Sequence, residues 1–69
     1  MFDKLIRLNK AELDMRLGET IPKHKLKDMV DVGKRKEFEQ NGYKVMVDRT
    51  RSETIVIFLS DGENTYFYA

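Results

Sequence analysis

The sequence predicts an α+β domain in which two to three short N-terminal helices pack on a three-stranded antiparallel β-meander of strand order 1-2-3. Thr54 to Leu59 contains no charge, Gly or Pro and is rich in β-branched residues, which favours a strand. This segment is apolar on both sides, as a central strand is. Tyr43 to Asp48 alternates in polarity and Asn64 to Tyr68 follows a turn signal, so these segments are predicted to flank it.

Length and composition restrict the class of protein. A chain of 69 residues is expected to form a single domain, residues 1–69, with one small core. The absence of Cys excludes disulfides and thiolate metal sites and fits a reducing compartment. No segment reaches the roughly 20 apolar residues of a membrane span, and the N-terminus lacks the apolar core of a signal peptide. A cytoplasmic protein without membrane contact is therefore expected.

The first segment, Phe2 to Leu17, is predicted to be a helix because it is rich in helix formers and gathers apolar residues on one side. Gly18 then stands where a helix ends. A hairpin with its loop at Asn9-Lys10-Ala11 is the competing interpretation. Asn9 and Glu12 also have the spacing of a capping box, which predicts a short first segment followed by a second helix start at Asn9.

The next region is predicted to form two short helices, Lys23 to Asp31 and Lys34 to Gln40. Thr20-Ile21-Pro22 favours a helix start. A single straight helix would place Phe38 opposite the other apolar residues, so a break near Gly33 is expected. Asn41-Gly42 is interpreted as the end of the second helix.

The turn signals predict the register of the meander. A two-residue turn at Asp61-Gly62 would pair Ile57 with Tyr66, and the first hairpin is predicted to set Arg49 opposite Glu53. One sheet face then forms the core: Tyr43, Val45, Val47, Ile55, Ile57, Leu59, Tyr66 and Tyr68. The other face, called the outer face below, carries Lys44, Met46, Asp48, Thr54, Val56, Phe58, Thr65 and Phe67.

Cationic residues give a first functional hypothesis. Two short helices followed by a hairpin whose loop carries Arg is a winged-helix-like order, in which the second helix enters the major groove. Glu37 and Glu39 weaken this interpretation, and a solvated helix beside a hairpin is the simpler alternative. The predicted nucleic-acid contacts are Lys23, Lys27, Lys34, Arg35, Lys36, Arg49 and Arg51.

The outer face gives a second hypothesis. Met46, Val56, Phe58 and Phe67 are predicted to form an apolar strip there. The favoured interpretation is that the N-terminal helix crosses this face and makes the strip a second layer of core. The alternatives are a protein partner, a second copy or stacked bases. The edge of the Asn64 to Tyr68 strand is a further candidate for protein binding.

Catalysis, metal binding and cofactor binding are not expected. His24 is the single His and has no second ligand of the usual type, and no Ser or Thr has a plausible base partner. The sequence thus predicts a non-catalytic binding module, with a nucleic-acid-binding regulator as the first choice. A protein-binding regulator or inhibitor, or a homodimer, is the alternative.

Overall fold

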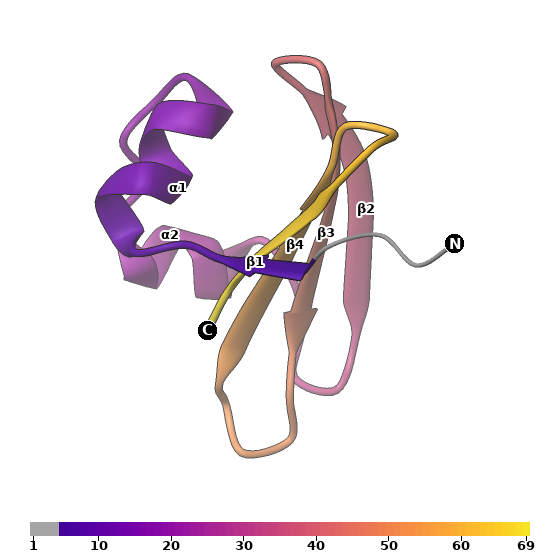
Figure 1. Cartoon of the computed structure of the whole chain (residues 1–69). Coiled ribbons are helices and arrows are strands. Elements are labelled where there is room, and N and C mark those ends of the chain that lie inside the picture. Colours follow the sequence, from indigo (N-terminus) through magenta and orange to yellow (C-terminus); the bar gives the residue numbers. More distant parts are fainter. Residues whose placement is uncertain (1–4) are drawn as a thin grey trace.

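The computed structural model describes residues 5–69, which form an α+β domain as predicted (Figure 1). The predicted N-terminal helix lies outside the described residues in its first part, up to Lys4. The elements follow in the order β1 (Leu5–Arg7), α1 (Lys10–Leu17), α2 (Lys23–Asp28), β2 (Arg35–Gln40), β3 (Tyr43–Arg49), β4 (Ile55–Ser60) and β5 (Thr65–Tyr68).

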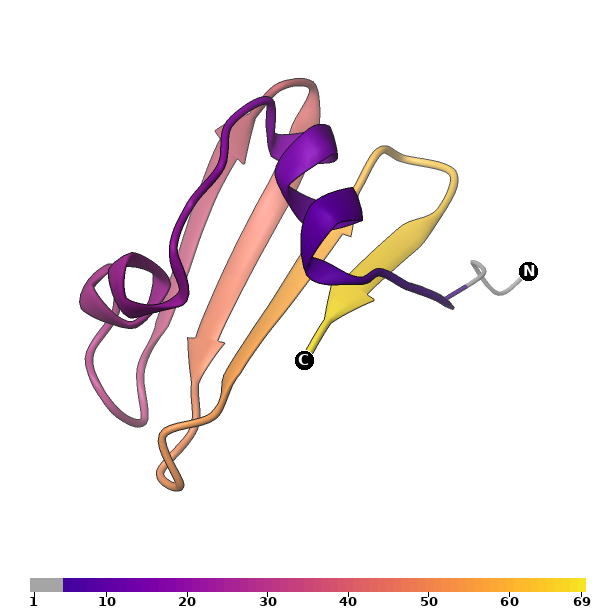
Figure 2. The same ribbon diagram turned by 90° about the vertical axis from the view of Figure 1, so that its left-hand side faces the viewer.

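Within the described chain, the strands form one five-stranded sheet of order β1-β5-β4-β3-β2. The predicted meander is present as β3, β4 and β5, and β4 is the central strand, as expected from its apolar sequence. The prediction of only three strands is wrong, because β2 adds to one edge antiparallel to β3 and β1 adds to the other edge parallel to β5. The predicted protein-binding edge of the Asn64 to Tyr68 strand is wrong for the same reason, since β5 is paired on both sides. Both described helices lie on the same side of this sheet (Figures 1 and 2).

Helix α1 begins at the capping box that the sequence indicates. The Asn9 side chain accepts a hydrogen bond from the Glu12 amide at 2.8 Å, and the Asn9 amide donates to Glu12 Oε1 at 3.0 Å. Gly18, with φ 77°, ends the helix. The second helix start at Asn9 is thus confirmed. The single helix from Phe2 to Leu17 and the alternative hairpin are both wrong, because Leu5–Arg7 pairs with β5.

The largest correction concerns the predicted helix Lys34 to Gln40, which is an edge strand. Gln40 pairs with Tyr43 across Asn41 and Gly42, whose φ angles are 53° and 83°. Positive φ at both central residues is the geometry that connects two strands without splaying them, and Asn-Gly adopts it readily. Asn41-Gly42 therefore turns a hairpin, and the winged-helix-like order is wrong. The preceding helix is also shorter than predicted, since α2 ends at Asp28.

Both predicted hairpin registers are shifted by two residues. Ile57 pairs with Tyr68, and Arg49 with Ile55, because the connecting loops are longer than expected. In the second loop, Asp61 Oδ1 accepts hydrogen bonds from the amides of Glu63 and Asn64, which lower the pKa of this carboxyl below its ordinary value. A shift of two residues keeps every side chain on its face, so the predicted division into core and outer faces is confirmed.

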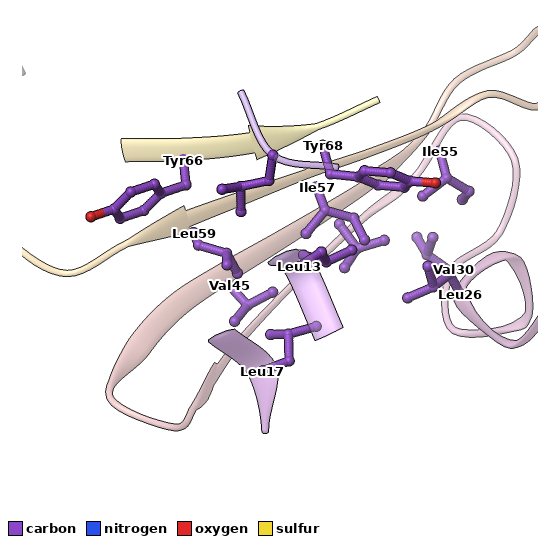
Figure 3. Packing of buried hydrophobic residues seen from close by; sticks show 12 residues of the cluster. Leu13, Leu17, Leu26, Val30, Val45, Ile55, Ile57, Leu59, Tyr66 and Tyr68 are labelled. Atoms are coloured by element: carbon purple, nitrogen blue, oxygen red, sulfur yellow. The ribbon is translucent and has the colours of Figure 1, made fainter. Parts of the chain in front are cut away.

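The core lies between the sheet and the two helices (Figure 3). Ile57 and Leu59 of β4 are fully buried, as is Leu13 of α1. Of the eight residues predicted for the core face, seven are buried and Tyr43 is half-buried. The helix side adds Leu8, Leu13, Leu17, Leu26 and Val30 to this core.

Candidate functional site

The predicted apolar strip lies on the outer face, and no helix of the described chain covers it. Met46, Phe58 and Phe67 pair with one another directly across β3, β4 and β5, and Val56 lies on β4 one position along the same face. All four side chains are half-buried, whereas the alternate residues of β4 are buried. The strip is therefore accessible on the side of the sheet opposite the core.

The expectation that the N-terminal helix crosses this strip is wrong. Helix α1 packs on the core face, where Leu13 and Leu17 meet the inward side chains of the sheet (Figure 3). Gln40 Nε2 donates to the Leu17 carbonyl at 2.7 Å, and Asn41 Nδ2 donates to the Arg16 carbonyl at 2.7 Å. These bonds fix the end of α1 to the β2–β3 hairpin.

Charged residues stand at both ends of the strip. Phe67 pairs with Arg7 of β1, and Met46 pairs with Glu37 of β2. The outer face therefore carries one row that crosses all five strands, called the central row below: Arg7, Phe67, Phe58, Met46 and Glu37. Its middle is apolar and its two ends have opposite charge.

The outer face as a whole is electrically balanced. Alternation along the paired strands places three basic and three acidic residues on it, and two of these, Arg35 and Asp48, form an ion pair at 2.8 Å. The Asp48 carboxylate raises the pKa of the Arg35 guanidinium above its ordinary value through this hydrogen bond. The charged residues of the face are Arg7, Arg35, Lys44, Glu37, Glu39 and Asp48.

The structure does not unite the predicted nucleic-acid contacts on one surface. Four of the seven, Lys34, Arg35, Arg49 and Arg51, line a shallow groove together with Val56 and Phe58. Lys23 and Lys27 belong to α2 and line a separate depression beside Tyr68, and the Lys36 ammonium lies 5.8 Å from the centre of the Phe38 ring. The helix that was expected to carry Lys34, Arg35 and Lys36 is absent, because these residues lead into and begin β2.

Arg49 has a role in holding the domain together that the sequence did not indicate. One of its terminal nitrogens donates to the carbonyls of Lys27 and Val30, at 3.1 and 3.3 Å, and the other pairs with Glu53 at 2.8 Å. The side chain is 20% exposed. Arg49 therefore connects the end of α2 to the β3–β4 loop, and both of its terminal nitrogens have partners within the domain.

Residues 5–69 contain no cluster of three His, Cys, Asp or Glu side chains that could hold a metal ion, and His24 is an exposed residue of α2. No described helix is long and apolar enough to cross a membrane. A comparison with known protein families, with curated proteins and with solved structures finds no match for this chain. The fold and the surface thus define a small α+β domain with one open, partly apolar sheet face.

Two members of the central row could not be assigned from the sequence. Arg7 was placed within a helix and Glu37 within another, so neither was expected beside the apolar strip. The Asn41-Gly42 pair was the available signal for Glu37, because this dipeptide between a polar segment and an alternating segment is a strong hairpin signal. Arg7 depends on a parallel pairing with a distant segment, for which short-range patterns give no signal.

Proposed function

We propose that this domain is a non-catalytic protein-binding module whose interface is the outer face of the sheet. The observation that supports this proposal is the uncovered apolar strip of Met46, Val56, Phe58 and Phe67, which spans three adjacent strands. Apolar surface that is contiguous and bordered by polar residues marks interaction sites in soluble proteins. Leu5, which is 60% exposed beside Thr65, extends the apolar area toward β1.

The charge balance of the outer face favours a protein over a polyanion. A nucleic-acid interface presents an excess of Lys and Arg, which releases the counterions of the phosphates. The outer face instead carries three basic and three acidic residues, and Arg35 is already paired with Asp48. An aromatic centre with a charged rim is the arrangement of a protein interface.

Phe58 is expected to be the anchor of this interface, because it occupies the middle of the central row. Introducing a photo-crosslinking aromatic residue, Phe58→p-benzoylphenylalanine, should give crosslinked protein bands in the cells that make the chain. Added wild-type protein should compete for these products, and Phe58→Ser should compete at least about 30-fold less well, since central aromatic anchors contribute about 2 kcal/mol or more.

The matched control carries the same crosslinker at Met15, which is 76% exposed on α1 and on the other side of the molecule. Circular dichroism of Phe58→Ser checks that the variant remains folded. Equal crosslinking from positions 15 and 58, or competition by Phe58→Ser as strong as by the wild type, would contradict the proposed interface.

Nucleic-acid binding is the second candidate function, and the groove lined by Lys34, Arg35, Arg51, Val56 and Phe58 favours it. Cations beside a half-buried aromatic ring on an open face suit a single strand of nucleic acid, whose bases stack on the ring while its phosphates pair with the cations. Three phosphate contacts predict a slope of log affinity against log salt of about −2 on single strands, and Arg51→Ala should reduce its magnitude by about 0.7. Fluorescence anisotropy with labelled oligonucleotides measures this slope, and no binding at 50 mM salt would remove this candidate.

A further inference from the structure

The central row has an order of charged and apolar residues that is complementary to itself. Along the row, positive Arg7 is followed by Phe67, Phe58 and Met46, and negative Glu37 closes it. Phe58 belongs to β4, which has two strands on either side in the described sheet. A rotation by 180° about an axis along β4 therefore exchanges the positions of the two charged ends.

We propose that the protein bound by the outer face is a second copy of this chain, packed face to face with a twofold axis parallel to β4. This inference rests on the proposed function and names its partner. In this arrangement Phe58 meets the partner's Phe58, and Phe67 meets the partner's Met46. A twofold interface uses the same patch on both copies, so each of the other contacts occurs twice.

Within the central row, charge favours this axis over the other twofold arrangement of two stacked sheets. With the axis along β4, Arg7 faces the partner's Glu37 at both ends of the central row. An axis perpendicular to the strands would instead set Arg7 against Arg7 and Glu37 against Glu37. Juxtaposed like charges are unfavourable at an interface. In the flanking rows, however, the second axis would set Arg35 against Glu39 and Lys44 against Asp48. The two axes are therefore separated by experiment: with the second axis, Arg7→Glu replaces one like-charge contact by another and leaves association unchanged.

The expected packing angle is compatible with these charge pairs. Stacked sheets align within about 30° of each other, and adjacent strands lie about 4.8 Å apart. Arg7 and Glu37 are each two strands from the axis, so such an angle displaces them by only about 5 Å. The long side chains of Arg and Glu can span this displacement.

The size of the face indicates a weak dimer. Five strands at about 4.8 Å and five residues at about 3.3 Å give a flat area of about 400 Å² per copy. The total of about 800 Å² is below the roughly 1,000 Å² of a stable specific interface, so we expect weak, transient association. Detection therefore needs protein at tens to hundreds of micromolar.

Sedimentation equilibrium of charge-reversed variants tests the arrangement. Arg7→Glu and Glu37→Arg should each weaken the dimer at least about tenfold, because each creates two like-charge contacts. An equimolar mixture of the two variants should dimerise at least as well as the wild type. The double variant Arg7→Glu/Glu37→Arg should recover wild-type association, since it exchanges the charges at both ends of the row. Lys25→Glu, an exposed charge reversal on α2, is the control and should leave association unchanged.

The outcomes separate this inference from the proposed function. A wild-type protein that stays monomeric at 500 μM overturns the dimer. Loss of association in both single variants without recovery in the double variant overturns the axis along β4. If the crosslinker at Phe58 gives products with other proteins but none of twice the chain mass, the second copy is rejected while the protein-binding function stands. Absence of any specific product from position 58 rejects both.

Discussion

Ile57→Ala is expected to lower the free energy of unfolding by about 2–5 kcal/mol, because it leaves a cavity where the surrounding core cannot fully collapse. Ile57 is fully buried on the central strand and lies between Val47 and Tyr68 in the sheet. Its side chain points toward the helix side, where Leu13 lies (Figure 3). For a domain of this size, such a loss is a large part of the total stability.

Urea unfolding followed by circular dichroism measures this loss as a change in midpoint at constant slope. Val56→Ala is the matched control, since Val56 is the neighbouring residue on β4 and is half-buried on the outer face. We expect the control to lose about 1 kcal/mol or less, because its side chain leaves no enclosed cavity. A loss below 1 kcal/mol for Ile57→Ala would contradict the central position of β4.

Arg49→Met is expected to destabilise the domain by about 2–3 kcal/mol. The substitution keeps an unbranched stem but removes the donors to the Lys27 and Val30 carbonyls and the ion pair with Glu53. Hydrogen bonds that involve a charged group contribute about 1.5–3 kcal/mol. The Lys27 carbonyl keeps a bond from the Val30 amide, whereas the partly buried Val30 carbonyl loses the Arg49 donor and adds a desolvation cost. We expect the end of α2 to separate from the β3–β4 loop in this variant.

Urea midpoints again measure the change, and Arg51→Met is the control. Arg51 is exposed in the same loop and is two residues away, so its replacement should alter stability by less than about 0.5 kcal/mol. If Arg49→Met kept wild-type stability and instead weakened oligonucleotide binding, Arg49 would be a ligand contact, and the structural role assigned to it would be wrong.

The strands that were predicted correctly are those whose own residues determine them. β4 is apolar on both faces, β3 alternates, and each must be buried on at least one side to be stable. The predicted division of side chains between core and outer faces is also correct despite the wrong registers, because both registers differ from the predicted ones by two residues. Asn9 and Glu12 determined the start of α1 in the same local way.

The two edge strands depend on their neighbours instead. Arg35–Gln40 carries only one apolar residue, Phe38, and its exposed charged residues suit a helix surface as well as a sheet edge. Its strand conformation comes from pairing with β3 across the Asn41-Gly42 turn. Leu5–Arg7 has three residues, too few for either periodicity, and becomes a strand only beside β5.

The difference between central and edge strands also explains which parts of the candidate site could be predicted. The apolar strip was predicted residue by residue because it belongs to the central strands. Its charged ends were not predicted, since Arg7 and Glu37 lie on the two edge strands. The predicted nucleic-acid contacts do not form one surface, because that surface required a helix from Lys34 to Gln40, where the structure has a strand.

The parallel pairing of β1 with β5 has a consequence for the order in which the domain folds. Leu5 pairs with Thr65, so this contact closes a loop that contains nearly the whole described chain. The hairpins β2–β3, β3–β4 and β4–β5 close much shorter loops and form without waiting for it. We therefore expect β1 to dock last and to separate first, together with the bond from the Leu8 amide to the Phe67 carbonyl. Because Arg7 lies on β1, the positive end of the central row is completed only in this last step of folding.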